Sequence, residues 1–394
     1  MARIGVVYSS LSHSLGGAEK LCIETIHALK CAGHQIDLIV TAKTDQKKIK
    51  EIFGVCVDFD KEIIVHPHAP LSTIYSRFIK WFFRDVLMVS HLRKNYDLMV
   101  TTQPFLPLTF TDVVYMNDLL DFPTTLELHY SKYRRGFWKF YKLPYETIID
   151  ISIKLFNSLK SKPLVLTNSR FTKQKIEGYL NVKPLVVYPP VDVANYLRLS
   201  RNTNRENIVL TISRLEKGKG LELIPYVASR VKSAKFVIVG SLSSRNNLSY
   251  LHSLICNLGV KDRVEVVPNA SHRTKEILLS KAKIYLHPRK NEYFGIAVVE
   301  AMAAGSIPLV HRSGGPWIDI LNQEQGVYGY SYEDIVSCAN HINEIIEQYS
   351  RLGIPQRAVE RSKIFTTKIF RKNINSVVNM LLRDYAENNE MQLS

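Results

Sequence analysis

The sequence predicts an α/β protein made of two doubly wound domains, each built on a parallel sheet. The chain has 394 residues, which is too long for one comfortable hydrophobic core. Short apolar strands alternate with helix-like segments through both halves, a pattern typical of parallel sheets covered by helices. Hydrophobic residues make up 46% of the chain and charged residues 22%, which excludes a disordered protein.

The first half opens with an apolar strand at Ile4–Tyr8, followed by a Ser- and Gly-rich loop at Ser9–Gly17. Ala18–Lys30 has apolar residues at the spacing of one helix face, so we expect a helix there. The remaining strands predicted in this half are Ile36–Thr41, Leu98–Thr101, Val113–Tyr115 and Leu164–Thr167.

The second half repeats the alternation and predicts a second sheet. A double proline in Val187–Asp192 separates the halves and predicts a stiff, extended connector. We therefore expect an N-terminal domain at residues 1–186, a C-terminal domain at residues 187–365, and a helical tail at residues 366–394. The strands predicted in the second half are Ile208–Ile212, Phe236–Val239, Val264–Val267, Ile284–His287 and Pro308–Val310.

The chain is strongly basic. It carries 52 Lys and Arg against 36 Asp and Glu, a formal net charge of +16. Such an excess favours polyanionic partners: phosphorylated substrates, anionic lipid headgroups or nucleic acid.

The cysteines and the termini predict the compartment. Five scattered cysteines without a CxxC pair favour neither a zinc site nor a disulfide framework, so we expect a reducing compartment. The first residues begin directly as a strand without a signal-peptide pattern, and no run approaches the ~18–20 apolar residues of a membrane span. We expect a cytoplasmic protein that is peripheral on the cytosolic face of a membrane.

Two segments, Ser76–Asp85 and Tyr130–Lys142, interleave Lys and Arg with aromatic residues. Such segments suit the headgroup region of a bilayer, and we favour an anionic membrane surface as the partner. Plain packing with outward charges and stacking on single-stranded bases are the alternatives. No nucleic-acid-binding motif accompanies them, so we expect no nucleic-acid partner. The membrane-surface candidates are Lys80, Trp81, Phe82, Arg134, Arg135 and Trp138.

The most informative stretch runs from Glu292 to Glu300. Glu292 lies in a Pro-containing loop, and Phe294–Ile296 then opens the helix that carries Glu300. A helix N-terminus presents unpaired N–H groups and the positive end of the helix dipole, which suits a phosphate. Carboxylates on either side can accept hydrogen bonds from neutral hydroxyls, so the pattern predicts a nucleotide-sugar site. The alternative is that the two acids only form a solvated helix face.

In each half, one loop that follows the first strand is a candidate for binding an anion. In the first, Gly16 and Gly17 open a helix and let the backbone approach an anion closely, although a simple turn is the commoner role for such glycines. In the second, Arg214 and Lys219 are spaced wrongly for a Walker A loop. Two cations there would offset the negative charge that develops on a leaving nucleotide; a basic surface loop is the alternative.

The Glu292–Glu300 stretch resembles the E-x7-E signature of the retaining glycosyltransferases of family 4. The similarity extends over His287–Asp319, with its run FGIAVVEAMAAGSIPLVHRSGGP. It is closest to the dolichol-pathway α-1,2-mannosyltransferases, which extend the lipid-linked N-glycan precursor. Weaker similarity is recognisable at Gly16–Glu19, Asn168–Thr172, Tyr188–Asp192 and Arg214–Lys219.

The resemblance implies the GT-B fold, in which two Rossmann-like domains face each other across a cleft and the last helix crosses back to the N-terminal domain. It also implies retaining transfer of a hexose, with mannose from GDP-mannose favoured, onto a lipid-linked glycan. Glu292 would contact the hydroxyls of the donor sugar and Glu300 those of the ribose, while Arg214 and Lys219 would hold the diphosphate. The further donor-binding positions that it implies are Gly16, Gly17, Asn269, Phe294, Gly295 and Ile296.

The chain departs from the family pattern at Asn117 and Asp118, where many relatives have a His close to the reacting centre. Either Asp118 takes a polar role near the acceptor or the correspondence is shifted by a residue or more. Retaining enzymes of this fold are thought to use the leaving phosphate to deprotonate the acceptor, so a protein base is not required. The chain has no DxD dyad of the kind used with a divalent cation, and we expect neither a metal nor another cofactor.

Three alternatives stay open. The same fold can use a UDP-sugar with the same carboxylates, and a GT-B sugar-nucleotide epimerase would consume donor without an acceptor. The third alternative is a non-catalytic partner subunit. Such a subunit usually lacks the diphosphate-binding residues, whereas Arg214, Lys219, Glu292 and Glu300 are all present.

Overall fold

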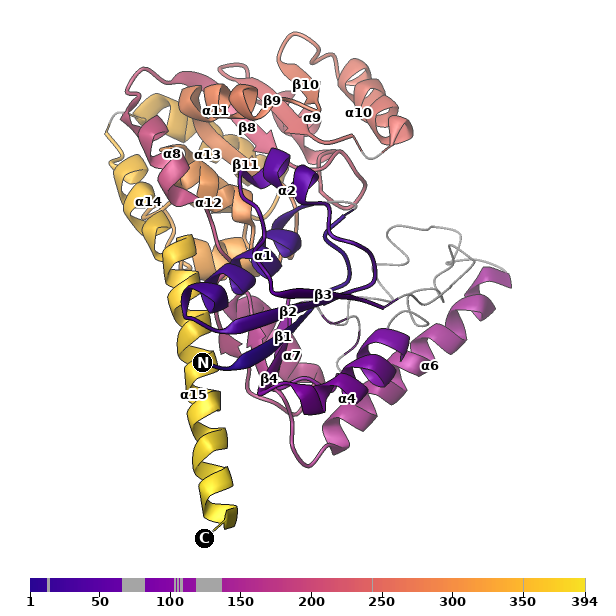
Figure 1. The fold of residues 1–394 in the computed structure, drawn as a ribbon. Coiled ribbons are helices and arrows are strands. Elements are labelled where there is room, and N and C mark those ends of the chain that lie inside the picture. Colours follow the sequence, from indigo (N-terminus) through magenta and orange to yellow (C-terminus); the bar gives the residue numbers. More distant parts are fainter. Residues whose placement is uncertain are drawn as a thin grey trace. The chain divides into compact units, whose positions relative to one another are not determined.

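The computed structural model divides the chain into two compact units (Figure 1). The first unit comprises Met1–Pro190 and Thr367–Ser394, and the second comprises Val191–Thr366. The described residues are 1–12, 15–65, 82–102, 104, 106, 109–117, 137–242, 244–349 and 351–393.

The first unit is built on a parallel sheet whose strand order is β3-β2-β1-β4-β5-β6-β7. The order reverses direction between β1 and β4, as in a doubly wound fold. The apolar runs predicted from the sequence form its central strands, while the short edge strands β3 and β7 were not predicted. The strands are β1 (Arg3–Val7), β2 (Gln35–Val40), β3 (Lys61–Ile64), β4 (Leu98–Thr101), β5 (Val113–Met116), β6 (Leu164–Thr167) and β7 (Leu185–Val186).

Helices cover both faces of this sheet because successive strand residues point to opposite sides. Val6 belongs to the core beneath α1, α2 and α15, whereas its neighbour Val7 packs with α4 on the other face. Val114 packs with α6 and α7, also on that second face. The helical elements are α1 (Gly17–Cys31), α2 (Gln46–Phe53), the π-helical turn η1 (Phe82–Met88), α4 (Val89–Leu92), the 3₁₀ turn η2 (Arg93–Asn95), α6 (Phe137–Ser158), α7 (Arg170–Tyr179) and α15 (Thr367–Leu393).

The C-terminal helix α15 is part of the first unit, although it follows the whole second unit in sequence. Phe370, Ile374 and Val378 are buried in the same core cluster as the apolar face of α1. Arg371 donates to the buried carboxylate of Glu24 on α1 over 2.7 Å. These contacts anchor the end of the chain to the N-terminal sheet.

The second unit has a six-stranded parallel sheet in the order β10-β9-β8-β11-β12-β13. This is the order 3-2-1-4-5-6 of a dinucleotide-binding domain, with the reversal between β8 and β11. The three-residue edge strand β13 was not predicted. The strands are β8 (Glu206–Ile212), β9 (Lys235–Gly240), β10 (Val264–Pro268), β11 (Ala282–His287), β12 (Ile307–His311) and β13 (Tyr330–Tyr332).

The helices of the second unit pack against this sheet, and its largest core cluster joins α9, α10 and α13 to β8, β9 and β11. Both units are thus Rossmann-like α/β domains, as the sequence predicted. The helical elements are α8 (Val193–Leu197), η4 (Arg198–Arg201), α9 (Leu223–Ala228), α10 (Arg245–Asn257), α11 (His272–Lys281), α12 (Ile296–Ala303), η5 (Pro316–Ile320), α13 (Ile335–Gln348), α14 (Ile354–Ser362) and η6 (Lys363–Phe365).

The chain passes between the units after Pro190, four residues beyond the predicted end of the first domain. Val187 still belongs to the first unit, because its N–H donates to Thr167 O on β6 over 2.9 Å and its side chain is buried there. Val191 belongs to the second, where it pairs with Thr366 in a parallel bridge. The stiff connector therefore contributes to both units.

Most of the membrane-surface candidates lie outside the described residues: Lys80, Trp81, Arg134 and Arg135. Trp138 is in α6, where side chains are described from Glu146 onward. Phe82 is described and is 45% exposed at the start of η1. Within the described part of the chain, no helix has an apolar stretch long enough to cross a bilayer.

Candidate functional site

The carboxyl ends of β8 and β11 define the candidate site of the second unit. These strands are neighbours, and the strand order reverses between them. Ligands of doubly wound sheets bind at such a reversal, beyond the carboxyl ends of the strands. The loop after β8 contains Arg214 and Lys219, and the loop after β11 contains Arg289 and Glu292.

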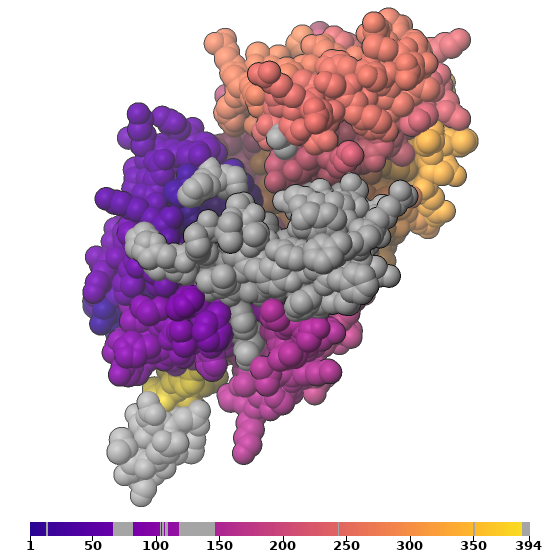
Figure 2. Space-filling model, turned by 90° about the vertical axis from the view of Figure 1, so that its right-hand side faces the viewer, coloured from indigo at the N-terminus to yellow at the C-terminus, as the bar shows by residue number. Residues whose placement is uncertain are grey.

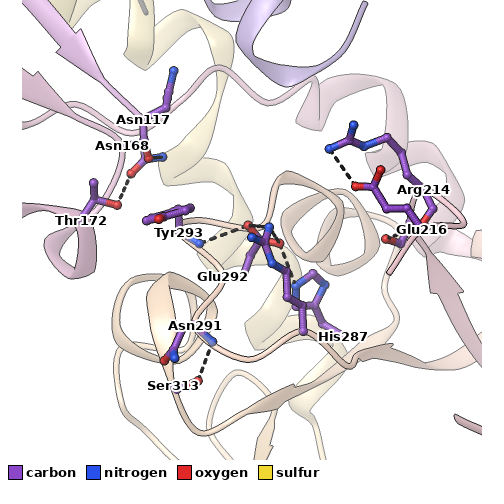
Figure 3. A network of polar contacts seen from close by, with 12 residues as sticks. Asn117, Asn168, Thr172, Arg214, Glu216, His287, Asn291, Glu292, Tyr293 and Ser313 are labelled. Carbon is purple, nitrogen blue, oxygen red and sulfur yellow. Dashed lines mark hydrogen bonds and ion pairs between the residues drawn. The ribbon is translucent and has the colours of Figure 1, made fainter. Parts of the chain in front are cut away.

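Glu292 is the centre of a polar cluster in this site (Figure 3). Nη1 of Arg289 lies 3.1 Å from both of its carboxylate oxygens. Nε2 of His287 lies 3.5 Å from Oε2, at the outer limit of a hydrogen bond. His287 ends β11 and Arg289 lies in the loop after it, so this one segment holds its own carboxylate in place.

The charge state of Glu292 follows from these neighbours. Burial alone raises the pKa of its carboxyl group. The contact with His287 and the positive charges of Arg289 and Lys219 lower it more, so the pKa lies well below its usual range. Glu292 is therefore an ionised hydrogen-bond acceptor at neutral pH.

Lys219 and Arg214 add positive charge beside this carboxylate. Arg214 is paired with Glu216 at 3.1 Å, and its side chain is mostly exposed. Lys219 is half-buried, and no carboxylate of the described residues lies within ion-pair distance of it. Burial, together with the charges of Arg289 and Arg214, lowers the pKa of Lys219, while Glu292 opposes that shift. The arrangement can accept an anion.

The backbone around Glu292 is held by a glycine pair. Gly315 donates its N–H to Glu292 O over 2.8 Å, and the Ser313 hydroxyl accepts from the N–H of Asn291 over 2.9 Å (Figure 3). A Cβ at Gly314 would lie 2.4 Å from Glu292 O, and one at Gly315 would meet backbone as closely. Only glycine permits this approach, which explains the two adjacent glycines in the His287–Asp319 stretch.

Helix α12 begins directly after this loop. Gly295 precedes its first residue with a φ of 93°, which favours glycine, and no side chain caps the helix. Its first-turn N–H groups can therefore bind an anion. Glu300 lies further along α12, and the negative charge of Glu300 adds to burial in raising the pKa of the Tyr196 and Tyr285 hydroxyls.

Asn269 follows β10 and adopts a left-handed conformation with a φ of 53°. Its side-chain oxygen accepts from the N–H of Leu242 over 2.9 Å, and its own N–H donates to Gly240 O. The asparagine thus fixes the loops after β9 and β10 to each other.

The glycine loop belongs to the first unit, where Gly16 precedes α1. Glu19 holds this loop, because its carboxylate accepts from the Gly16 N–H and from the Tyr8 hydroxyl, each over 2.8 Å. The loop follows β1, so it too lies at the point where the strand order of its sheet reverses.

The segment at Asn168 has internal contacts. Ser169 caps α7 by accepting from Thr172 N over 2.9 Å, and Asn168 donates to Asn117 O over 2.9 Å (Figure 3). Asn117 directly follows β5, whereas Asp118 lies outside the described residues.

No role was predicted for His287, Arg289 or Glu216. In the structure, His287 and Arg289 lie beside Glu292, and Glu216 pairs with Arg214. The spacing of Arg289 and Glu292 was visible, but it identifies an ion pair only once the turn between them is known. Among the described residues, no group of three or more His, Cys, Asp or Glu side chains could hold a metal ion.

Two family models match the chain consecutively. "Glycosyltransferase Family 4" matches residues 15–195, and "Glycosyl transferases group 1" matches residues 196–363. The boundary between the matches falls near the division between the two structural units. The chain belongs to glycosyltransferase family 4.

Similar curated proteins agree with this family 4 assignment. The GDP-Man:Man(3)GlcNAc(2)-PP-Dol alpha-1,2-mannosyltransferase of Dictyostelium discoideum is 29% identical over 62% of this chain and 52% of its own length. The mouse protein of the same name is 32% identical over 51% of this chain and 44% of its own length. The family 4 chain thus spans about half the length of these relatives.

Solved structures resemble the family 4 chain in fold. The structure of Anabaena HepE in complex with UDP-glucose covers 96% of this chain and all of its own, with a TM-score of 0.66 at 19% identity. At this identity the likeness extends to the fold, which is GT-B.

Proposed function

We propose that this chain is a retaining glycosyltransferase that moves a hexose from a nucleotide sugar onto a lipid-linked glycan. The observation that carries the proposal is the half-buried Lys219, which lacks an ion-pair partner in the described chain, beside Arg214, Arg289 and an uncapped helix. Arg214 and Arg289 are each paired with one carboxylate, so the three cations leave an excess of positive charge at Lys219. This excess favours an anion, and a nucleoside diphosphate provides one.

In the proposed complex, the diphosphate binds between the two basic loops and the N-terminus of α12. Arg214 and Lys219 neutralise the charge that grows on the leaving nucleotide as the glycosidic bond breaks. The acceptor hydroxyl forms its bond to the anomeric carbon on the same face, and its proton goes to the leaving phosphate. The cations perform the electrostatic role, so we propose that no metal takes part.

Glu292 and Glu300 orient the donor. The low pKa of Glu292 keeps it ionised, so sugar hydroxyls can donate to it. Glu300, further along α12, would accept from the ribose hydroxyls.

We favour mannose from GDP-mannose as the donor, because the curated relatives are named for that transfer. A uridine nucleotide is the alternative supported by a specific observation: the similar HepE fold is solved with UDP-glucose. The relatives are also named for acceptors on PP-Dol, which supports a lipid-linked acceptor here.

A lipid-linked acceptor implies contact with a membrane surface, which we also propose. Phe82, Phe83 and Leu87 on η1 are each more than two-fifths exposed, as are Ile151 and Leu155 on α6. Residues of α6 lie on the surface of the first unit, in magenta in Figure 2. Exposed apolar side chains on a basic protein suit an anionic bilayer.

The first experiment is thermal stabilisation by GDP, UDP, ADP, GDP-mannose and UDP-sugars without metal. A ligand at about 100 times its Kd adds about 2.7 kcal/mol to the stability of the folded state. Selective stabilisation by guanosine nucleotides supports the mannosyltransferase, and selective stabilisation by uridine nucleotides replaces the donor. Absence of any shift favours a non-catalytic partner, and donor consumption without acceptor favours an epimerase.

The carboxylates can then be separated by substitution. Glu300→Ala should weaken nucleotide binding, whereas Glu292→Ala should mainly reduce turnover. Unchanged nucleotide affinity in Glu300→Ala would contradict the role proposed for it.

A further inference from the structure

Arg205 is a buried arginine outside the candidate site, and it donates almost entirely to backbone carbonyls. It lies between η4 and β8 and is 9% exposed. Nη1 donates to Ala282 O over 2.7 Å and to Leu279 O over 3.1 Å. Nη2 donates to Ala304 O. No carboxylate of the described chain lies within ion-pair distance of this guanidinium.

These carbonyls belong to the C-terminal ends of two helices. Leu279 is in the last turn of α11, which Ala282 terminates, and Ala304 terminates α12. Helix C-termini carry partial negative charge and leave carbonyls without intrahelical partners. One guanidinium therefore neutralises two helix ends and satisfies their carbonyls.

Gly305, which directly follows the end of α12, makes room for this contact. Gly305 has a φ of 88°, and a Cβ on it would lie 2.7 Å from Nη2 of Arg205. The turn also closes α12, because Ser306 donates to Ala301 O and Gly305 donates to Met302 O. Gly305 thus both ends the helix and admits the guanidinium.

We call the contact of Arg205 with the C-terminus of α12 the clamp. It lies one turn from Glu300, since Ala304 donates its N–H to Glu300 O over 3.0 Å. Helix α12 has only eight residues, so it is about 12 Å long. A short, rigid helix that moves at one end also moves at the other.

We infer that Arg205 is a positioning residue for donor binding: by holding the C-terminus of α12, it fixes Glu300 and the N–H groups at the opposite end. The inference rests on the proposed function, since α12 matters to binding only if the donor occupies its N-terminus. Arg205 would thus act on donor binding through α12, without contacting the donor itself.

The test compares Arg205→Met and Arg205→Lys with Ile342→Ala, a buried core substitution on α13 that creates a cavity away from α12. We would first measure the melting temperatures. Nucleotide Kd and amide hydrogen exchange over residues 296–304 would then be measured well below all of them.

Arg205→Met should raise the nucleotide Kd roughly tenfold, which is the lower end of the loss in affinity when a residue that orients a metal ligand is removed from a metal site. It should also speed hydrogen exchange in α12. Arg205→Lys keeps a charge at the helix ends and should fall between this variant and the wild type. Ile342→Ala should lower the melting temperature without changing the Kd.

A folded Arg205→Met variant with wild-type Kd and wild-type exchange in α12 would overturn the inference. If Arg205→Met does not fold, Arg205→Lys decides by the same two readouts. If the wild type binds no nucleotide, the proposed function fails, and exchange in α12 alone tests the clamp. Faster exchange than in Ile342→Ala would support the clamp, and equal exchange would reject it.

Discussion

Nη1 of Arg289 lies 3.1 Å from both carboxylate oxygens of Glu292, three residues away. The carboxylate that we propose contacts the donor sugar is therefore already paired in the free protein. Its ionised state is set by this partner together with His287 and Lys219, against the effect of burial. Sugar hydroxyls would find an acceptor that is fixed in position and charged.

Arg289→Met should lower kcat/KM by roughly 10- to 100-fold, as is typical when a group that orients a site residue is lost. Removing the cation raises the pKa of Glu292, and activity requires the ionised form. The acid limb of the pH–rate profile should therefore move to higher pH. Steady-state kinetics between roughly pH 4 and 8 would measure this shift, because that range starts near the ordinary pKa of a carboxyl group and extends above it.

The matched control for that experiment is Arg312→Met. Arg312 pairs with Glu333 at 2.9 Å in the same unit, and both side chains are more than half exposed. Its loss should leave the profile unchanged. An acid limb that moves equally in both variants, or in neither, would contradict the role given to Arg289.

Lys219 should make nucleotide binding sensitive to alkali. Its pKa is lowered in the free protein, first by burial and then by Arg289 and Arg214. A bound diphosphate favours the protonated amine, so binding takes up a proton once pH approaches the free-state pKa. The Kd should therefore rise with pH, and calorimetry in two buffers of different ionisation enthalpy should detect proton uptake.

Lys219→Arg provides the comparison, because a guanidinium does not titrate in this range. The nucleobase titrates equally in both proteins, so the difference between them isolates the lysine. If the two proteins have the same pH dependence, Lys219 does not contact the diphosphate.

The central strands of both sheets could be predicted because their apolar runs are buried. Leu98–Thr101 and Leu164–Thr167 have the predicted bounds. The edge strand β3 begins with Lys61 and Glu62, and β13 has only three residues, so neither has a clear strand pattern. Edge strands owe their conformation to a neighbouring strand, which the local sequence does not reveal.

The residues of the candidate site also divide into those that could be predicted from the sequence and those that could not. Glu292 and Glu300 stand in a run whose helix start and glycines are visible in the sequence. The partnership of Arg289 with Glu292 depends on a turn in which Asn291 adopts a φ of 51°, and left-handed asparagine is only a tendency. The missing ion-pair partner of Lys219 depends on tertiary burial, which no motif encodes.

Gly220 and Gly218 form a natural pair for testing how closely the two basic loops must approach. Both have positive φ, 73° and 86°. A Cβ at Gly220 would lie 2.6 Å from Pro288 O, whereas one at Gly218 would meet no atom within 4 Å. The backbone strain of an alanine is common to both positions, at about 1–2 kcal/mol.

Gly218→Ala should therefore lose about that free energy of unfolding and little nucleotide affinity. Gly220→Ala should lose more of both, because Pro288 is backbone and its displacement moves the β11 loop. Denaturant unfolding and nucleotide titration would measure the two effects. Similar affinities in the two variants would mean that the loops can separate without harm.

Arg371 should stabilise the first unit and leave the donor site unaffected. Its guanidinium donates to Glu24, whose side chain is 7% exposed, and it joins α15 to α1. Arg371→Met leaves a buried carboxylate unpaired and should lower the free energy of unfolding by about 1–3 kcal/mol. The loss should lie towards the lower end of this range because solvent reaches the arginine. Hydrogen exchange should quicken in α1 and α15, while the second-unit strands and the nucleotide Kd stay unchanged.

The double variant Arg371→Met with Glu24→Leu separates two causes of instability: the lost attraction between Arg371 and Glu24, and the unpaired buried charge of Glu24. Replacing both members of a buried pair by apolar residues is often neutral, so much of the lost stability should return. If the double variant is as unstable as Arg371→Met alone, the lost attraction and not the unpaired carboxylate accounts for the loss of stability. Quickened exchange in the second-unit strands would instead mean that α15 also stabilises the donor domain.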